Sequence, residues 1–435
     1  MQIANSTHDP LLRSWVASAD HHADFPIQNL PFGVVCSIGE SDPDPRIAVA
    51  IGNFALDLRS CYRAGLLRSL DGSKESVFEA RVLNPLMNEG PKFWSTLRNW
   101  LSLALREGSA LQAELEPHLI SRSAVNLSVP VDIPDYTDFY CSIEHATNVG
   151  KIFRPDEPLL PNFKNLPIAY HGRSSSIVIS GTPVTRPKGQ RLEAGTIVFG
   201  PTSMLDYEVE LGAFLGGPTA LGDTICLEEA HSHLFGICLL NDWSARDIQA
   251  WEYRPLGPFL SKSFATSISG WVVTLEALAP FRVPAAHRAA DDPKLLPYLD
   301  GAALSSAGLN IEVEAFIQTV AMRSASVEAQ PVSSVNARGL YWTFAQMITH
   351  HSSNGCPMQT GDLLGSGTIS GSEPGTQGSL LEITGRGAQE LQLSGERRRF
   401  LQDGDTVILR GRCHAPGARS IGFGESVGVI MPARI

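Results

Sequence analysis

The sequence predicts a mainly β protein with some α-helix, in which a small N-terminal β domain precedes a large C-terminal β-rich domain. The 435 residues include 39 glycines and 29 prolines, scattered without a fixed period, which indicates many turns. Helical periodicity is concentrated in residues 75–118, whereas the chain after residue 135 reads as short strands between Gly/Pro turns. Both observations favour a turn-rich, largely β architecture.

Two apolar runs open the N-terminal region. Residues 32–38 and 47–53 are separated by a turn at 42–46, which is typical of short strands in a small β-barrel or β-roll. Residues 75–118 then carry apolar side chains three and four positions apart, so we predict helix there, with a break at Gly90-Pro91. The apolar positions are Trp94, Leu97, Leu101 and Leu105.

The domain boundary is expected in a polar stretch between residues 117 and 135, which contains Pro117, Pro130 and Pro134. The predicted domains are residues 1–125 and 126–435. Residues 279–308 carry four prolines with little periodicity, so we expect a long excursion from the larger domain there.

Composition and charge exclude several classes of protein. Hydrophobic residues make up 43% and charged residues 18% of the chain, which is enough apolar material for large cores and excludes wholesale disorder. The net charge is −11, and the tight basic run at 397–399 is too short for a nucleic-acid-binding face. The seven cysteines include no C-x-x-C pair and indicate reduced thiols in the cytoplasm. Neither a signal peptide nor a run of 18 apolar residues is evident, so no membrane partner is expected.

Three acidic residues alternate in the segment Asp206-Tyr207-Glu208-Val209-Glu210. On a strand, Asp206, Glu208 and Glu210 would share one face, with neighbours about 7 Å apart. Carboxylates this close repel one another unless they are solvated or share a cation. Taken alone, the pattern favours a solvated outer face over a metal site.

A second polar segment follows the apolar run 234–240. Asp242 falls at the end of this expected strand, and a short helix stopped by Pro255 and Gly257 comes next. Arg246, Gln249 and Tyr253 have the spacing of one helix face and suit a polar, anionic ligand. The alternatives, an N-cap role for Asp242 and an ordinary surface for the helix, are equally compatible with the pattern.

Two further segments can carry chemistry. His145 lies in a stretch rich in acidic and aromatic residues, and a base role for it requires an orienting carboxylate nearby in space. The glycines of 361–371 do not fit a nucleotide-binding motif, so a turn between strands is favoured, although Thr368 could offer a hydroxyl to a ligand. The pairs His231/His233 and His350/His351 lack a partner at zinc spacing.

Taken together, these segments resemble the fumarylacetoacetate hydrolase family. The resemblance covers nearly all of the chain and is strongest over residues 131–382. It rests on several motifs in fixed order: D-Y-T-D-F-Y, E-H-A-T-N-V-G, Y-H-G-R-S-S-S, D-Y-E-V-E-L-G, N-D-W-S-A-R-D-I-Q-A-W-E-Y-R-P-L-G-P-F-L-S-K-S-F, T-H-H-S-S-N-G-C and G-S-G-T-I-S-G.

The resemblance implies an SH3-like N-terminal β domain and a C-terminal β-roll domain that carries the active site. It implies a metal-dependent hydrolase that cleaves a C–C bond of 4-fumarylacetoacetate, giving fumarate and acetoacetate, the last step of tyrosine and phenylalanine breakdown. It also implies a Ca²⁺ or Mg²⁺ cofactor, a homodimer and a cytoplasmic location.

Site roles follow from the same resemblance. Four carboxylates, which suit a hard cation better than zinc, would bind the metal: Asp138, Glu208, Glu210 and Asp242. Lys262 and Thr266 would lie beside a second cation position near Asp242, whereas Asp206 is not among the implied ligands. His145 would be the base and Glu382 would orient it, with negative charge stabilised by Arg246, Gln249 and Lys262. The implied substrate-binding residues are Tyr140, Arg154, Gln249, Tyr253 and Thr368.

Two alternatives stay open beside this interpretation. One is a relative that hydrolyses acylpyruvates, or decarboxylates or isomerises diketo acids, on the same scaffold. The N-terminal domain and the combination of Asp138, Tyr140 and His145 favour the first interpretation over that relative. The other is a non-catalytic scaffold protein, against which the presence of His145, Glu382 and Lys262 argues.

Overall fold

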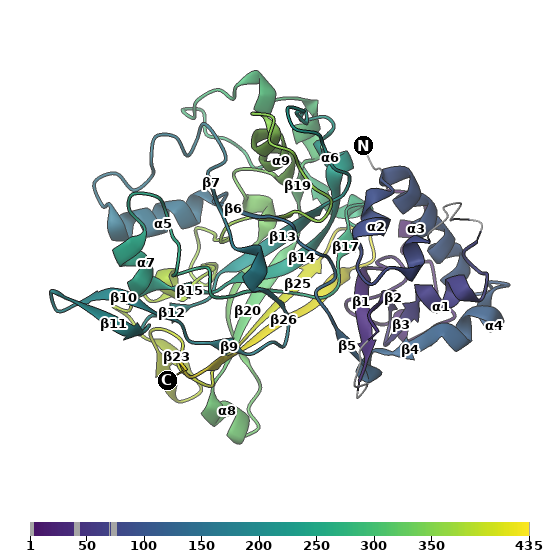
Figure 1. Ribbon diagram of the computed structural model, residues 1–435, viewed down its shortest axis with the longest axis horizontal. Coiled ribbons are helices and arrows are strands. Elements are labelled where there is room, and N and C mark those ends of the chain that lie inside the picture. Colours follow the sequence, from purple (N-terminus) through teal and green to yellow (C-terminus); the bar gives the residue numbers. More distant parts are fainter. Residues whose placement is uncertain (1–3, 39–43, 69, 71–75, 435) are drawn as a thin grey trace.

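The N-terminal region is built on a five-stranded antiparallel sheet with the strand order β4-β3-β2-β1-β5 (Figure 1). This computed structural model describes residues 4–38, 44–68, 70 and 76–434. Two strands form where the sequence predicts them, whereas residues 42–43 of the predicted turn lie outside the described residues. The strands are β1 (Phe32–Ser37), β2 (Arg46–Ile51), β3 (Phe54–Asp57), β4 (Leu119–Ser121) and β5 (Val125–Leu127).

In the described part of this region, four α-helices accompany the sheet: α1 (Leu58–Arg63), α2 (Asn84–Asn88), α3 (Pro91–Leu105) and α4 (Gln112–Leu115). The predicted break at Gly90-Pro91 is confirmed, since α3 begins at Pro91, where a missing backbone N–H costs no hydrogen bond. The four apolar positions at helical spacing are all buried on the side of α3 that faces the core. Residue 75 of the predicted helical segment lies outside the described residues.

The C-terminal region is built on two sheets. The larger is a mixed eight-stranded sheet with the order β7-β6-β22-β13-β14-β16-β8, in which β17 also pairs with β14. Strand β22 is parallel to β6 and β8 is parallel to β16, and the other pairs are antiparallel. Its strands are β6 (Tyr136–Phe139), β7 (Ala169–His171), β8 (Ile177–Ile179), β13 (Val209–Leu215), β14 (Leu234–Asp242), β16 (Thr266–Ile268), β17 (Val273–Thr274) and β22 (Leu363–Gly365).

The second sheet has five strands in the order β21-β20-β25-β26-β9. Its strands are β9 (Val184–Thr185), β20 (Glu312–Gln318), β21 (Gln330–Asn336), β25 (Thr406–Cys413) and β26 (Ile421–Met431). Four two-stranded ribbons complete the region: β10 (Lys188–Glu193) with β11 (Thr196–Pro201), β12 (Leu205–Asp206) with β15 (Ser244–Ala245), β18 (Arg282–Val283) with β19 (Gly308–Leu309), and β23 (Leu391–Leu393) with β24 (Glu396–Arg398). The predicted mainly β class, with a small N-terminal and a large C-terminal β region, is confirmed.

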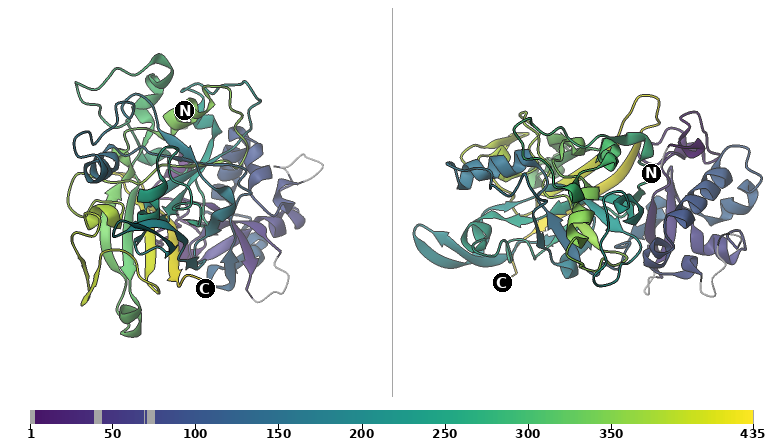
Figure 2. Two further views of the ribbon diagram at one scale, coloured as in Figure 1. Left: turned by 60° about the vertical axis from the view of Figure 1, so that its left-hand side comes forward. Right: turned by 90° about the horizontal axis from the view of Figure 1, so that it is seen from above.

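Strands β13 and β14 lie at the centre of the molecule and are covered on both faces, since every residue of both strands is buried. Side chains alternate between the two faces of a strand, and here each face has its own core. Leu211 and Leu239 belong to the core shared with the second sheet, whereas Phe214 and Leu240 pack with apolar residues of the N-terminal region. The two regions therefore pack on opposite faces of the same pair of strands. Figure 2 shows the N-terminal region lying directly against the larger region.

The remaining helices lie around the large sheet: α5 (Ile143–Phe153), α6 (Ala230–His233), α7 (Arg246–Glu252), α8 (Val320–Ser324), α9 (Phe344–Ser352) and α10 (Leu380–Ile383). Helices α5 and α7 lie close together on the side of the molecule away from the N-terminal region (Figure 1). Residues 279–308 form the predicted long excursion from the larger domain. Its two ends pair with each other in the β18–β19 ribbon. It packs back on the protein, since Lys164 Nζ lies 2.5 Å from Asp292 Oδ1.

Strand β5, at residues 125–127, pairs with β1 and so crosses the predicted boundary between residues 125 and 126. The division into domains 1–125 and 126–435 stays a prediction. All seven cysteines lie in the described part of the chain and are free thiols. Within the described residues, no helix has the length and apolar character needed to cross a membrane.

Candidate active site

A cavity of about 500 Å³ lies between α5, α7 and the strand ends of the large sheet. Its walls also include Phe163 and Ile168 from the segment that follows α5. Most of the site residues predicted from the sequence line it: Asp138, Tyr140, His145, Arg154, Glu208, Glu210, Arg246, Gln249, Tyr253, Lys262 and Thr368. Asp242 and Glu382 are not in the lining but contact residues that are, namely Lys262 and His145, and Thr266 in turn contacts Asp242.

Three carboxylates from three strands meet at one side of this cavity, where Asp138 and Glu210 line it and Asp242 lies behind them. Asp138 lies near the end of β6, Glu210 near the start of β13 and Asp242 at the end of β14, and the three are 3%, 0% and 1% exposed. One oxygen from each lies within 4.8 Å of the others. Oδ1 of Asp138 and both oxygens of Glu210 have no hydrogen-bond partner among the described residues.

The space for this cluster depends on a glycine. Strand β22 lies between β6 and β13, and its Gly365 pairs with both Asp138 and Gly212. A Cβ atom at Gly365 would lie 2.5 Å from Asp138 Oδ1 and 3.1 Å from Glu210 Oε2. Any side chain here would therefore fill the space between the two carboxylates.

The cluster is electrostatically incomplete on its own. Burial, followed by the neighbouring carboxylates, raises the pKa of Asp138 and Glu210 well above the ordinary range, and burial is also the main reason that the pKa of Asp242 is raised. A buried carboxylate without a partner is costly, and a bound cation would satisfy its oxygens. An all-oxygen set of three carboxylates fits a hard divalent cation such as Ca²⁺ or Mg²⁺.

Glu208 differs from this cluster because both of its oxygens face cationic side chains. Arg246 Nη1 lies 2.7 Å from Oε1, and Lys262 Nζ lies 2.5 Å from Oε2. Burial alone would raise the pKa of Glu208, but Lys262 and Arg246 outweigh it and hold the pKa below its ordinary value. Lys262 Nζ also lies 2.6 Å from Asp242 Oδ2, so this lysine links Glu208 to the carboxylate cluster.

A histidine–glutamate pair lies beside the cluster. His145 is in the first turn of α5, and its Nδ1 lies 2.7 Å from Glu382 Oε2 on α10. Burial alone would raise the pKa of Glu382, but His145 and hydrogen bonds from Asn148 and Ser379 hold it below the ordinary value. Because an ionised carboxylate can only accept, Nδ1–H of His145 is the donor, which leaves Nε2 as the ring nitrogen free to take a proton.

Comparisons with known proteins show the family of the chain. A family model described as "Fumarylacetoacetase N-terminal" matches residues 28–130, and one described as "Fumarylacetoacetate (FAA) hydrolase C-terminal" matches residues 136–426. The chain belongs to the fumarylacetoacetate hydrolase family. It is 44% identical to the fumarylacetoacetase of Homo sapiens, over 94% of this chain and 97% of that protein. It is 45% identical to the fumarylacetoacetase of Arabidopsis thaliana, over 97% of this chain and 99% of that protein.

Solved structures support the fold alone. A fumarylacetoacetate hydrolase from Exiguobacterium antarcticum superposes with a TM-score of 0.52 at 17% sequence identity, covering 93% of this chain and 100% of that chain. This likeness places the chain in the fold of the fumarylacetoacetate hydrolase family and says nothing of its individual side chains.

The acidic segment departs from the sequence-based interpretation. The alternation predicts one face for Asp206, Glu208 and Glu210, but the strand is interrupted at 207–208 and Asp206 belongs to β12, which pairs with β15. The reading of this segment as a solvated outer face is wrong, since the three acids are 0%, 5% and 0% exposed. The interruption turns Asp206 away from the carboxylate cluster and toward Arg246, 2.8 Å from its Oδ2.

The second polar segment borders the cavity. Asp242 ends β14, and the N-cap of α7 is Ala245, so the N-cap alternative for Asp242 is wrong. Arg246, Gln249 and Tyr253 face the cavity together, so the helix face is no ordinary surface. The glycine-rich stretch 361–371 contains the strand β22, and Thr368 beyond it lines the cavity.

Sequence reasoning missed several polar residues of the site, of which Tyr170 and Asn148 are two. The hydroxyl of Tyr170 donates to Asp242 Oδ2 at 3.1 Å, and Nδ2 of Asn148 donates to Glu382 Oε1 at 3.0 Å. Asn148 follows His145 by three positions, which is one helical turn, so predicting α5 would have placed both on one face. No local signal indicates Tyr170, because its contact with Asp242 spans 72 residues.

Proposed function

We propose that this chain hydrolyses the C–C bond of 4-fumarylacetoacetate to give fumarate and acetoacetate. The observation that carries the proposal is that a carboxylate-oriented histidine, His145, lines the same cavity as two members, Asp138 and Glu210, of a cluster of three carboxylates. The fumarylacetoacetases named above, 44–45% identical over at least 94% of the chain, identify the substrate class. This would be the last step of tyrosine and phenylalanine breakdown.

The cofactor is proposed to be Ca²⁺ or Mg²⁺, held by Asp138, Glu210 and Asp242, with Glu208 as a further ligand. A divalent cation there would act as a Lewis acid on the 1,3-diketone and stabilise the enolate that leaves. Glu208 can serve as a ligand because one carboxylate oxygen can accept from a cationic side chain while also facing a metal. Thr266 Oγ1, which donates to Asp242 Oδ1 at 3.2 Å, and Lys262 lie where a second cation is proposed.

His145 acts as the general base. Its Nε2 takes a proton from water as the water oxygen attacks the substrate carbonyl carbon, and the proton is returned to the leaving carbon when the C–C bond breaks. Glu382 holds the imidazole through Nδ1 and stabilises the imidazolium form between these two transfers. Arg246, Gln249 and Lys262 offer N–H groups to the negative charge that develops on the substrate oxygens.

Substrate binding requires local cations, because the protein carries a net charge of −11 and the substrate bears carboxylates. Arg154 suits this role: it lines the cavity, and its Nε has no hydrogen-bond partner within the described part of the chain. Hydroxyl groups around the cavity complete the proposed binding set, namely those of Tyr140, Tyr253 and Thr368.

A cytoplasmic homodimer is proposed as the working form. The seven free thiols suit a reducing compartment. The β10–β11 ribbon, which projects from the body in Figure 1, exposes Leu192, Ile197 and Phe199 by 56%, 53% and 73%, as expected of a surface that a second copy covers. Light scattering of the purified protein would give twice the chain mass of 46.9 kDa if the proposal holds, and the single mass if it does not.

The test of function follows the ultraviolet absorbance of fumarylacetoacetate. The purified protein is assayed as prepared, after EDTA, and after Mg²⁺ or Ca²⁺ is restored. Rapid loss of absorbance that EDTA stops and metal rescues would support both the substrate and the cofactor. No loss in the metal-replete sample would reject this substrate, and a panel of acylpyruvates would then test the alternative activity.

A further inference from the structure

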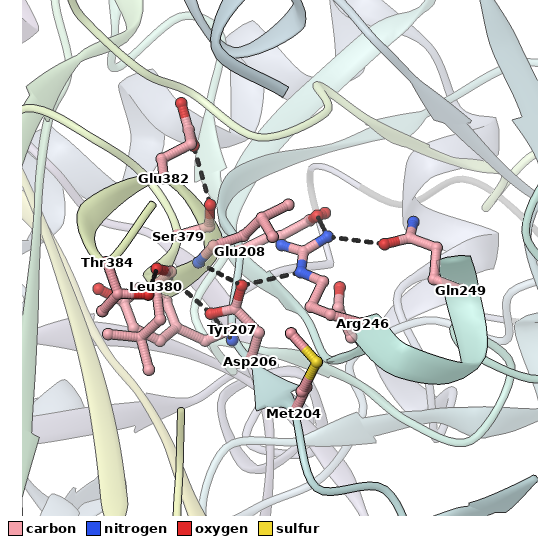
Figure 3. Close-up of polar contacts among 12 residues, drawn as sticks. Met204, Asp206, Tyr207, Glu208, Arg246, Gln249, Ser379, Leu380, Glu382 and Thr384 are labelled. Carbon is pink, nitrogen blue, oxygen red and sulfur yellow. Dashed lines mark hydrogen bonds and ion pairs between the residues drawn. The ribbon is translucent and has the colours of Figure 1, made fainter. Parts of the chain in front are cut away.

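Asp206 is a buried carboxylate that the proposed reaction does not use. It is 0% exposed, and its two oxygens together accept four hydrogen bonds. Oδ1 accepts from the backbone N–H groups of Tyr207 and Leu380, both at 2.8 Å. Oδ2 accepts from Arg246 Nε at 2.8 Å and from the backbone N–H of Leu381 at 2.9 Å. Figure 3 shows this carboxylate between Arg246 and the residues that lead to Glu382.

Each of these partners leads to a functional group of the site. Leu380 and Leu381 directly precede Glu382 on the short helix α10, and Glu382 holds His145 Nδ1 at 2.7 Å. Arg246 reaches Glu208 through Nη1 at 2.7 Å and Gln249 through the same atom at 3.1 Å. Nη2 of Arg246 is buried without a partner among the described residues, in a side chain that lines the cavity.

We propose that Asp206 is a positioning residue that holds the charge-stabilising arginine and the base-orienting glutamate at a fixed distance from each other. The inference rests on the proposed hydrolytic function of the same site. One carboxylate can set this distance because its two oxygens accept at fixed angles from groups 40 and about 175 residues away in the chain. Preorganisation of this kind is what general-base and charge-stabilising catalysis require.

The variant Asp206→Asn tests the proposal. The shape of the side chain is kept, but one oxygen becomes an NH₂ group that faces either Arg246 Nε or a backbone N–H, so a donor meets a donor. We expect kcat to fall about 10²-fold, because a small displacement of Arg246 and α10 spoils the reacting geometry. We expect KM to change by no more than about threefold, since Arg154 and the cavity hydroxyls are untouched.

Asp405→Asn is the matched control. Asp405 is also 0% exposed, and it accepts from Arg398 Nε at 2.8 Å, from Arg398 Nη2 at 3.0 Å and from the backbone N–H of Gln402 at 2.8 Å. None of these residues lines the cavity. Both variants lose a buried Asp–Arg pair, so a structural loss would lower the melting temperature in both. Only Asp206→Asn should lower kcat.

A second readout does not depend on the substrate. The proton between His145 Nδ1 and Glu382 should give a proton NMR signal far downfield of the amides, identified by its absence in His145→Ala. We expect this signal to shift or broaden in Asp206→Asn and to be unchanged in Asp405→Asn. A double-mutant cycle compares the loss of kcat that Asp206→Asn causes in the wild type and in the Glu382→Gln variant. The loss should be smaller in the Glu382→Gln variant, because the ionised contact between His145 and Glu382 is already broken there.

The outcomes separate this proposal from the proposed function. If the wild type does not hydrolyse fumarylacetoacetate but the His145 signal moves in Asp206→Asn alone, the positioning role stands and the function fails. An unchanged signal with kcat within about threefold of the wild type would overturn the positioning role. If Asp206→Asn does not fold, Asp206→Ser replaces it in both measurements, because the smaller hydroxyl group makes no donor–donor clash. If neither variant folds while Asp405→Asn does, Asp206 serves folding instead, and the proposal is overturned.

Discussion

Glu210 and Glu382 are glutamates at the same site whose side chains are both almost wholly hidden from solvent, yet their surroundings are opposite. Neither oxygen of Glu210 has a hydrogen-bond partner among the described residues, whereas Glu382 accepts four hydrogen bonds. Correspondingly, the pKa of Glu210 is raised well above the ordinary value, with burial as the largest cause, and that of Glu382 is lowered. Burial alone therefore does not define the role of a carboxylate. The partners around it decide whether it needs a cation or itself holds another group.

Asp362 is an intermediate case that sharpens the comparison. Its Oδ2 accepts from the backbone N–H of Gln359 at 2.8 Å, and its Oδ1 has no partner in the described part of the protein. Burial raises its pKa to about 6. Among the described residues, no group of carboxylates with metal-ligand geometry includes Asp362. Below about pH 6 this side chain is therefore neutralised by a proton, whereas the Glu210 cluster would take up a metal.

The largest effect is expected for His145→Ala, which removes the group that Glu382 holds. Turnover should fall at least about 10³-fold, because general-base catalysis is lost. Steady-state kinetics on fumarylacetoacetate give the loss, and calorimetry with Ca²⁺ should show an affinity within about threefold of the wild type, since no ligand is changed. Appreciable residual hydrolysis would remove His145 from the base role.

Glu210→Ala and Glu382→Gln test the comparison directly. Glu210→Ala should weaken Ca²⁺ binding at least about 100-fold and lower activity with it, because a ligand of the cluster is lost. Glu382→Gln should lower activity but leave the calorimetric Ca²⁺ affinity near that of the wild type. Equal Ca²⁺ affinities in the two variants would mean that the ligand set is wrong.

Lys262→Met tests the lysine between the cluster and Glu208. We expect kcat to fall about 10²-fold and KM to rise less than about tenfold, because the charge on the substrate oxygens grows in the transition state. The control is Lys164→Met, which breaks an equally short lysine–carboxylate pair outside the cavity lining and should leave kcat unchanged. A pure KM effect in Lys262→Met would make this residue a binding group only.

Asp362→Asn should give the smallest effect, and only at high pH. The folded pKa of about 6 lies above the ordinary 3.8, so the stability that neutral Asp362 contributes is fully present below pH 3.8 and is lost as the pH rises through 6. At pH 8 the variant, which cannot ionise, should therefore be more stable than the wild type by up to about 3 kcal/mol. Urea unfolding at pH 4 and pH 8 measures the difference, and a gain of equal size at both values would contradict this cause.

Local patterns were sufficient for much of the fold. Each correctly predicted element depends on residues that are close together in the sequence. These elements are the apolar runs of β1 and β2, the 3–4 spacing of α3 and the polar face of α7. The interruption after Asp206 was not predicted, because the alternation of 206–210 reads as one strand and only pairing with β15 shows the break.

The site was less accessible to sequence reasoning alone. His145 and Glu382 are 237 residues apart, and the strand that carries Asp138 reaches the paired strands that carry Glu210 and Asp242 only through β22. No local pattern encodes such distances, so these roles entered through the resemblance to a family. That resemblance named functional groups, and it did not indicate Asp206 because Asp206 contacts other residues rather than a ligand.

The absent side chain at Gly365 has a practical consequence. Because a single methyl group there would lie between Asp138 and Glu210, Gly365→Ala should exclude the cation while leaving every ligand, the histidine pair and the arginines in the chain. Such a protein would still offer its cationic side chains to the substrate carboxylates but could not turn the substrate over. It would serve as a trap in which the intact diketo acid can be captured for crystallography.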